Sequence, residues 1–474
     1  MTRLMRQSAR TTQRMAIALA FLLAGPAAVH GQEAPLVDAV KKGDVASVRA
    51  LLQRRANVNA VEPDGSTALH WSAHFDNTAL AGLLLKAGAD VNAANRYAVV
   101  PLSLAAVNGS AAMTELLLKH GANPNAARLE GETVLMTAAR TGSAETVKAL
   151  LAHGADVKAR ESWKGQDALA WAAGEGHKAV VEALIDHGAD VKAKSDDGYT
   201  ALMFAVRQGN ADVVAALVDK GADVDATNTN GMTPLTLAIY NSYWDIAGFL
   251  IDKGANVKAD ANGSTPLHLA IYIRTPDVES PFQAGAVRPP STLTGMDIIT
   301  ALIARGADVN AQMTRPFPRI AGPKETSLAG ATPFWLAAKG ADATVMKLLV
   351  DAGADPNIAT RQKTTPLMVA AGVGYSQAIS FGTEAQALEA VKLAKELGND
   401  INAQNAMGYT ALHGAAIRGA NSIVQYLADS GIRIDAKDRF GRTALTIAEL
   451  GAGDSTQRRQ LETAAYIQAL MARK

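Results

Sequence analysis

Histidine is the residue type that invites a search for metal-binding or acid–base chemistry, because the chain has nine histidines and no cysteine. His120, His153 and His187 recur at intervals of 33 and 34 residues, each directly before a glycine. At such positions a cation or hydrogen-bond donor stabilises the C-terminal end of a helix. Histidines in successive units of a helical stack lie about 10 Å apart, which is too far to share one metal ion. We therefore expect no metal site.

Other side chains with catalytic potential are equally isolated. Asp196 and Asp197 form a carboxylate pair that could act in acid–base catalysis, but they fall in a turn between units. Gly372 and Gly374 do not form a phosphate loop, because no strand pattern precedes them and no lysine follows at the required spacing. No cysteine is available as a nucleophile, a metal ligand or a disulfide partner. We expect no enzyme activity, no catalytic residue and no cofactor.

The element that must position any functional side chain is a pair of short helices, seen most clearly in residues 198–226. Thr200 is placed to cap the first helix and Gly209 to end it. Asn210 is placed to cap the second helix, and Gly221 ends it in the left-handed conformation, which costs other residues about 1–2 kcal/mol. The closing glycine recurs at Gly88, Gly121, Gly154, Gly188, Gly221 and Gly254, and again at Gly306, Gly353, Gly398 and Gly431. One unit is therefore repeated along the chain.

The start and end of this unit carry recognisable motifs. Thr265 to His268 reads TPLH and Gly88 to Ala93 reads GADVNA, and both resemble the ankyrin repeat. The resemblance covers Leu36 to Leu470 and implies about twelve repeats in an all-α fold. That fold is an ankyrin-repeat α-solenoid of helix-turn-helix units with short β-hairpin-like fingers. The resemblance also implies that the histidines of the TPLH position, His70, His268 and His413, make structural hydrogen bonds.

Residues 1–31 stand apart from the repeats and have the pattern of a secretory signal peptide. Four arginines precede the apolar run Met15 to Ala24, and small residues follow it. We expect cleavage after Gly31, with Val29 or Ala28 as alternatives, and an uncleaved anchor as the competing interpretation. The formal charge is +1, and the signal carries four arginines and no acids, so the mature chain is slightly acidic. This balance argues against nucleic acid as the main partner.

The remaining chain divides by the regularity of its units. We expect an N-terminal capping repeat at 32–64, regular repeats at 65–262, repeats with insertions at 263–439 and a C-terminal capping repeat with a final helix at 440–474. The insertions are placed at about 275–294, 312–330 and 376–387, from the lengthened spacing between repeat markers. The final helix is expected from about Ser455 to Met471, with its inner face formed by Leu461, Ala465, Ile467 and Leu470.

Three positions depart from the repeated pattern of caps and closing residues. Val100 replaces the capping threonine and has no side-chain acceptor, so the third unit should start loosely, whereas Asp167 can still cap. Arg55 stands where later units have the closing glycine.

The surface that the resemblance makes a binding face is the concave side, formed by inner helices and by the residue before each capping threonine. Carried to this sequence, these positions include Phe75, Trp163, Tyr199, Arg207, Met232, Tyr240, Tyr272, Tyr409 and Arg418. Trp, Tyr and Arg dominate the energetics of many interfaces. We expect a partner site with Arg315, Phe317 and Arg319 of the second insertion as a clamp. The alternatives are that the aromatics only cover neighbouring units, and that the loops are tolerated at small entropic cost.

The function that we expect is that of an exported scaffold for protein–protein interaction, from a bacterium with an envelope compartment. The protein is expected to be monomeric and periplasmic, with an extracellular location as the alternative. A second hypothesis is a secreted effector that engages host proteins. A third hypothesis, from another class, is a small-ligand binder or enzyme that uses a pocket between the inserted loops.

Overall fold

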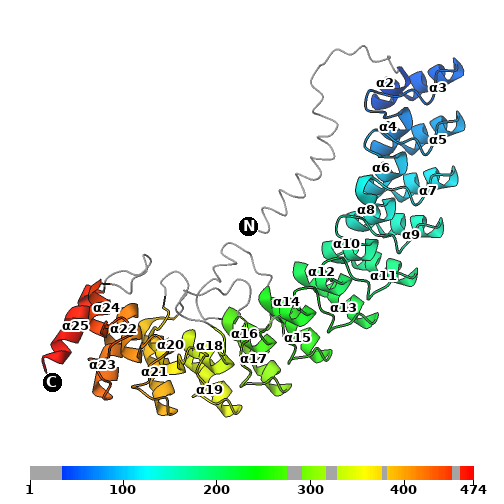
Figure 1. The fold of residues 1–474 in the computed structure, drawn as a ribbon. Helices are drawn as coiled ribbons and strands as arrows, with labels where there is room; N and C mark the ends of the chain where they lie inside the picture. The colour runs from blue at the N-terminus through cyan, green and yellow to red at the C-terminus, as the bar shows by residue number, and fades with distance from the viewer. Residues whose placement is uncertain are drawn as a thin grey trace. The chain divides into compact units, whose positions relative to one another are not determined.

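The computed structural model describes residues 35–261, 263–274, 291–315, 328–375, 382–450 and 460–473. These residues are all helical apart from loops, with no strand and only isolated β-bridges. The expected signal peptide lies outside the described residues. The chain divides into two compact units between Thr229 and Asn230, and each unit is a stack of helix pairs (Figure 1). No described helix is long and apolar enough to span a membrane.

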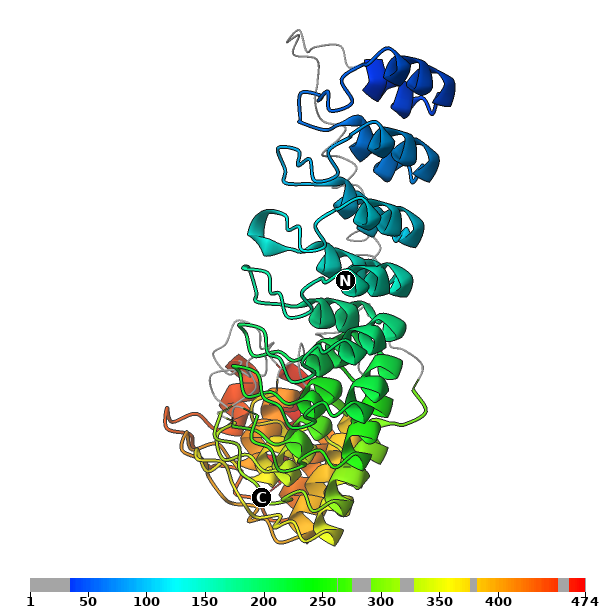
Figure 2. The ribbon, with the colours of Figure 1, turned by 90° about the vertical axis from the view of Figure 1, so that its right-hand side faces the viewer.

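The first unit, residues 35–229, contains helix pairs α2 to α13. Its inner helices are α2 (Pro35–Lys41), α4 (Ala68–His74), α6 (Pro101–Asn108), α8 (Val134–Thr141), α10 (Ala168–Glu175) and α12 (Ala201–Gln208). Its outer helices are α3 (Val45–Gln53), α5 (Thr78–Lys86), α7 (Ala111–Lys119), α9 (Ala144–Ala152), α11 (Lys178–Asp186) and α13 (Ala211–Asp219). Inner helices pack on inner helices and outer helices on outer helices. The fingers, which join one pair to the next, project to one side of the helices (Figure 2).

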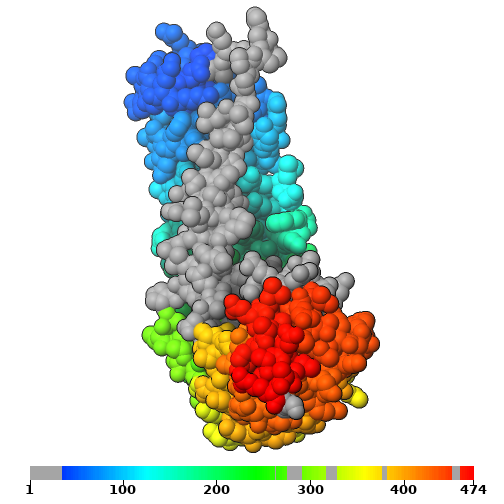
Figure 3. All heavy atoms as spheres, turned by 90° about the vertical axis from the view of Figure 1, so that its left-hand side faces the viewer, coloured from blue at the N-terminus to red at the C-terminus, as the bar shows by residue number. Residues whose placement is uncertain are grey.

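The second unit, residues 230–474, repeats the arrangement with α14 to α25. Its inner helices are α14 (Pro234–Tyr240), α16 (Pro266–Arg274), α18 (Pro333–Lys339), α20 (Pro366–Ala371), α22 (Ala411–Arg418) and α24 (Ala444–Leu450). Its outer helices are α15 (Trp244–Asp252), α17 (Gly295–Ala304), α19 (Ala343–Asp351), α21 (Glu384–Glu396), α23 (Asn421–Asp429) and α25 (Leu461–Met471). The last helix, α25, packs on α23 and α24 and is red in the space-filling view of Figure 3.

Helix boundaries follow the capping chemistry of the sequence. The Thr200 hydroxyl accepts a hydrogen bond from the backbone N–H of Met203, and Asp167 caps α10 in the same way. Val100 makes no side-chain cap, and Pro101 opens α6 instead. Gly221 has φ +86°, as its closing position requires. Arg55 occupies this left-handed region with φ 57°, so the N-terminal repeat accepts the strain that glycine avoids elsewhere.

Asn210 does not act as the side-chain cap that the sequence predicted. It stands at the N-cap of α13, but its side-chain amide donates instead to the carbonyls of Ala173 and Gly174, at 3.0 and 3.1 Å. His177 likewise makes no cap bond, and its Nε2 lies 3.0 Å from the carbonyl of Arg140. These side chains satisfy the last carbonyls of the preceding inner helix, because those carbonyls have no intrahelical donor. The bonds therefore join one helix pair to the next.

Asparagines of the closing motif join the fingers. Asn92 accepts a hydrogen bond from the N–H of Asn123 at 2.8 Å and donates to the carbonyl of Gly121 at 3.0 Å. Asn125 repeats both bonds one unit later, with Asp156 and Gly154. Units that carry Lys192 or Asp225 at this position lack the amide that bridges both groups.

The core is built from the repeated leucine of the inner helices. From Leu69 to Leu412, with Phe334 in the same position, this side chain is exposed by 2% or less. Leu445 in α24 is only partly buried. Burial of a full leucine contributes about 1.5–3 kcal/mol, so one such residue in each unit accounts for the repeated spacing.

The three expected insertions are only partly described. Helix α16 ends at Arg274 and α17 begins at Gly295, and residues 275–290 between them lie outside the described residues, as do 316–327 and 376–381. Asp245 on α15 holds the end of the first segment by accepting the N–H groups of Thr292 and Leu293. The residues expected as the end of the third insertion, 384–387, form the first turn of α21, which has 13 residues.

The final helix differs from the prediction in its inner face. Described α25 begins at Leu461, and residues 455–459 lie outside the described residues. Leu461 is 62% exposed and Ala465 is also exposed, whereas Ile467 and Leu470 are buried as expected. Thr463 and Ala464 take the inner positions, and the Thr463 hydroxyl donates to Asn421 at 2.7 Å. The prediction of Leu461 and Ala465 for the inner face was wrong, because the Thr463 hydroxyl bonds to Asn421 on α23 and turns Thr463 and Ala464 inward.

Candidate functional site

The candidate site is the set of side chains at the ends of inner helices and on the fingers, considered separately in each unit. At the N-terminal end of the first unit, Phe75 is 51% exposed and stacks on Trp71 with ring centroids 5.7 Å apart. Lys41 also lies over the Trp71 ring, with its Nζ 4.2 Å from the ring centroid. The indole N–H of Trp71 donates to Glu62 at 2.5 Å, and Glu62 also pairs with Lys41. Phe75 is thus an exposed ring on a fixed support.

Trp163 is the most exposed of the predicted aromatic residues that the structure describes, with 67% of its surface accessible. Its finger is held by the buried carboxylate of Glu161, which accepts the backbone N–H groups of Trp163, Lys164 and Gln166 at 2.5 to 3.0 Å. Lys164 in turn pairs with Asp197 at 3.1 Å. The indole therefore stands in solvent on a backbone that is already ordered.

Cations lie over aromatic rings along the inner helices of the first unit. The Arg207 guanidinium lies 5.3 Å from the ring of Tyr199 and 5.0 Å from that of Phe204. Arg140 lies 5.5 Å from the ring of Trp171, on the next inner helix. Arg207 is exposed and Tyr199 partly buried. The structure therefore brings the two predicted residues Arg207 and Tyr199 together, as a cation over an aromatic ring. The rings in these contacts also cover neighbouring side chains.

In the second unit, Tyr240 on α14 and Tyr272 on α16 are neighbours. Burial raises the pKa of Tyr272, and the nearby Tyr240 phenol raises it further. Both side chains are partly buried, as is Met232 in the preceding finger. Arg315 is exposed, while Phe317 and Arg319 lie outside the described residues.

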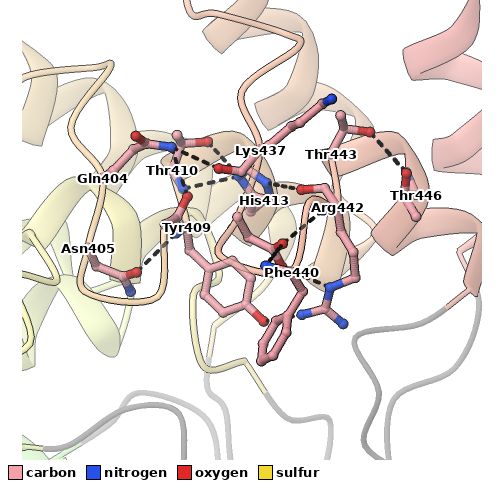
Figure 4. A network of polar contacts seen from close by, with 12 residues as sticks. Gln404, Asn405, Tyr409, Thr410, His413, Lys437, Phe440, Arg442, Thr443 and Thr446 are labelled. Carbon is pink, nitrogen blue, oxygen red and sulfur yellow. Dashed lines mark hydrogen bonds and ion pairs between the residues drawn. The ribbon is translucent and has the colours of Figure 1, made fainter.

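Tyr409 was predicted on the binding face but is 1% exposed. Its hydroxyl accepts a hydrogen bond from Arg442 Nη2 at 2.8 Å, and Arg442 Nε donates to Asp438 at 2.8 Å (Figure 4). Burial alone would raise the pKa of Asp438, but the hydrogen bonds from Arg442 and Phe440 hold it below its ordinary value. Tyr409 is a structural residue, because the next finger supplies an arginine that covers it.

The histidines of the TPLH position make the structural bonds that the resemblance implied. His268 Nδ1 lies 2.8 Å from the Thr265 hydroxyl and 3.2 Å from its N–H, and Nε2 lies 3.0 Å from the carbonyl of Ala311. Burial lowers the pKa of His268 to about 4, despite hydrogen bonds that favour the charged form. His70 and His413 show the same arrangement and the same direction of pKa.

Trp335 takes the histidine position in the helix pair α18–α19. Its indole N–H donates to the carbonyl of Thr364 at 2.9 Å, which replaces the bond made by the Nε2 of the histidines. This role of Trp335 was not predicted, although the order Thr332, Pro333, Phe334, Trp335 matches the TPLH start.

The histidines near the closing glycines also have local partners. His120 and His187 Nδ1 atoms lie 2.9 and 2.8 Å from carbonyls of the preceding helical turn, and His153 lies 3.5 Å from Glu115. Within the described ranges, no group of three or more histidine, aspartate or glutamate side chains has the geometry to hold a metal ion.

Two relatives share sequence similarity with part of this chain, over a small share of their own length. A transient receptor potential cation channel subfamily A member 1 homolog from Caenorhabditis elegans is 34% identical over 119 residues, which are 25% of this chain and 9% of the relative. Alpha-latrocrustotoxin-Lt1a from Latrodectus tredecimguttatus is 26% identical over 153 residues, 32% of this chain and 9% of the toxin. The chain therefore spans less than a tenth of the length of these relatives.

The family profiles cover much more of the chain. The profile described as ankyrin repeats in three copies matches residues 13–95, 94–161, 158–228, 202–278 and 376–457. The single ankyrin repeat profile matches residues 329–361. Together with the helix pairs and the capped TPLH starts, these matches establish that the chain belongs to the ankyrin-repeat family.

Proposed function

We propose that this protein is an exported ankyrin-repeat scaffold that binds another protein through its inner helices and fingers. Ankyrin repeats support a role in protein–protein interaction. The observation that carries the proposal is the presentation of Trp163, a largely exposed indole on a finger fixed by Glu161. Large aromatic rings lose a hydration shell on binding, and an ordered backbone lowers the entropy cost of association.

Arg207 and Phe75 support the same proposal in the first unit. The Arg207 guanidinium is exposed while its position is fixed by two rings, and Phe75 is fixed by Trp71. Both residues therefore combine accessibility with restricted motion, which is the property of many interface anchors. In the second unit we propose Tyr240, Tyr272, Met232 and Arg315 as further contacts.

The test is an affinity capture from an envelope extract with the chain Gln32–Lys474 as bait, followed by titration of the captured protein. Trp163→Ala and Arg207→Ala are expected to weaken binding about tenfold or more, as truncation of an anchor does. Leu129→Ala, on another exposed finger position, and Arg49→Ala, on outer helix α3, are the matched controls. If all four variants bound the captured protein with equal affinity, the proposed binding surface would be refuted.

Export is a separate part of the proposal and rests on the pattern of residues 1–31. Expression of the full chain in a bacterium with an envelope is expected to give a periplasmic monomer that begins at Gln32. A partner found only outside the producing cell would favour the secreted effector, and turnover that depends on the inserted loops would favour the enzyme hypothesis.

A further inference from the structure

The inner helices of the second unit carry a row of polar side chains at their C-terminal ends. Tyr240, Tyr272 and Lys339 stand seven residues after the capping threonines of α14, α16 and α18, and Arg418 stands eight residues after that of α22. We call these four residues the inner-end row. It places two phenols on α14 and α16 and two cations on α18 and α22. Both cations are partly buried.

Lys339 and Arg418 lie on helices separated by α20, and glycine explains how they come close. A Cβ atom at Gly414 would lie 2.6 Å from the backbone nitrogen of Val373, and one at Gly372 would lie 2.5 Å from the carbonyl oxygen of Gly414. The end of α20 therefore touches the backbone of α22. The Arg418 guanidinium donates to the carbonyl of Gly382, and a Cβ atom at Gly382 would lie 2.7 Å from the Cβ of Ala341 and 3.4 Å from the carbonyl oxygen of Gly340. The guanidinium therefore lies beside the residues that directly follow Lys339.

The electrostatics record this proximity. Burial, and to a smaller extent the positive charge of Arg418, lower the pKa of Lys339 to about 8. The pKa of Arg418 is also lowered, first by burial, while Tyr375 and Glu384 act in the opposite direction. Two neighbouring cations that have lost part of their hydration are unfavourable without a counter-charge.

Among the described residues, the hydrogen bonds of Arg418 go to carbonyl groups, Glu384 is a nearby carboxylate that offsets part of its charge, and no carboxylate forms an ion pair with Lys339. Arg418 Nη2 donates to the carbonyl of Gly382 at 2.6 Å, and its guanidinium lies 4.7 Å from the ring of Tyr375. Glu384 accepts hydrogen bonds from the N–H and hydroxyl of Ser422 at 2.8 and 2.6 Å. The nearby cation Arg274 pairs with Asp342.

We propose that Lys339 and Arg418 form a carboxylate-binding site for an acidic segment of the protein partner. A carboxylate accepts from both an ammonium and a guanidinium group, and such charge-assisted bonds are stronger than neutral ones. It also removes the repulsion between the two cations. Tyr240 and Tyr272 then offer ring surface and hydroxyl groups to the residues beside that carboxylate. This inference rests on the proposed scaffold function and names the chemistry of the partner.

The first test uses fluorescein-labelled hexaglutamate as the probe and fluorescence anisotropy at low salt. Lys339→Met and Arg418→Met are each expected to weaken binding at least about tenfold, as loss of one charged hydrogen-bond donor does. Lys347→Met on α19 is the matched control, because Lys347 is exposed and pairs with Glu389 at 3.4 Å. Thermal unfolding followed by circular dichroism shows whether each variant is folded, and Lys339→Met retains the apolar part of the side chain.

The competing probes are hexaglutamine and inorganic phosphate. Hexaglutamine is expected not to bind, because it lacks the charge. Equal affinity of the Lys339→Met and Lys347→Met variants for hexaglutamate would overturn the site. Displacement of hexaglutamate by submillimolar phosphate would overturn the carboxylate assignment in favour of a phosphate site.

The second test measures the ammonium group itself by NMR after ¹³C-dimethylation of lysines. The Lys339 signal is expected to titrate well below the ordinary lysine pKa of 10.5 in the free protein, and to move to higher pH with hexaglutamate, since a carboxylate favours the charged form. A Lys339 midpoint that hexaglutamate does not move would overturn the inference.

The outcomes separate this site from the scaffold function. A captured partner that binds Lys339→Met as tightly as the unchanged protein would overturn the site and leave the scaffold. If hexaglutamate bound but no protein partner were captured, the carboxylate-binding site would stand and the proposed scaffold function would be overturned.

Discussion

Burial of a neutral His268 makes the second unit sensitive to acid. Nδ1 faces the N–H and hydroxyl of Thr265 as an acceptor, and Nε2 donates to Ala311. Protonation would place a new N–H donor against the Thr265 N–H and charge a side chain that is 1% exposed. The native state therefore holds the neutral form, and the pKa falls from 6.5 to about 4.

The sign and size of the effect follow from linkage. The unfolded chain protonates at a higher pH than the native chain, so this stability is present above the unfolded pKa of 6.5 and is lost as the pH falls toward about 4. Between pH 7.5 and 4.5 one such histidine removes roughly 2.5 kcal/mol from the free energy of unfolding. His70 and His413 act in the same direction.

The perturbation that isolates His268 is its replacement by glutamine, which offers an N–H donor but does not titrate. The free energy of unfolding of the second unit is measured in urea at pH 7.5 and 4.5, from the hydrogen-exchange protection of the backbone amides of α16. The acid-induced loss of stability is expected to be smaller in His268→Gln than in the unchanged protein by roughly 2.5 kcal/mol. An equal loss in His268→Gln and the unchanged protein, or an NMR titration of His268 near 6.5, would refute the reasoning.

Three further changes test contacts between helix pairs by urea unfolding. Gly414→Ala is expected to destabilise the second unit by about 2 kcal/mol or more, because the added Cβ atom would clash with backbone atoms. Gly82→Ala should be neutral or stabilising, because a Cβ atom there would have nothing within 4 Å. Equal effects of the two substitutions would contradict the close approach at Gly414. Trp335→Phe should cost about 1–3 kcal/mol, because it removes the indole hydrogen bond to the buried carbonyl of Thr364 and leaves that carbonyl only the Thr360 N–H. Trp335→His should recover part of this loss, and no recovery would argue against the shared hydrogen bond. Asn92→Ala should cost about 1 kcal/mol by removing two finger bonds, while Lys192→Ala at the same position should be near neutral; equal values would exclude the asparagine bridge.

The fold was predictable because a local rule is repeated many times. A capping threonine, a buried leucine and a closing glycine each have one energetic reason, and the period makes their agreement visible in a single sequence. Thr200 and Gly221 illustrate this, since a cap and a left-handed residue depend only on neighbouring backbone. Helix α25 was less predictable, because the choice between Leu461 and Thr463 for the inner face depends on contacts with α23.

The candidate site was less predictable, because exposure depends on residues from adjacent units. Tyr409 has the same sequence position as Tyr199, but Arg442 of the following finger covers it. Trp163 could be selected from the sequence, whereas its support by Glu161 required the backbone geometry. Lys339 gave no signal in the sequence, since Arg418, whose charge lowers the pKa of Lys339, stands far along the chain and two helix pairs away.

The departures from the repeat are more informative about function than its regular positions. A threonine cap or a core leucine is required in each unit by folding alone, so its presence indicates nothing about a partner. Gly414, in contrast, stands where equivalent inner helices carry Trp71, Trp171 or Phe204, and it gives up the side chain that would fill this space. The consequence is a close backbone contact between α20 and α22, next to which burial and the charge of Arg418 lower the pKa of Lys339. A fold that needed only stability would gain nothing from this arrangement, whereas a surface that receives a carboxylate gains two donors already in position.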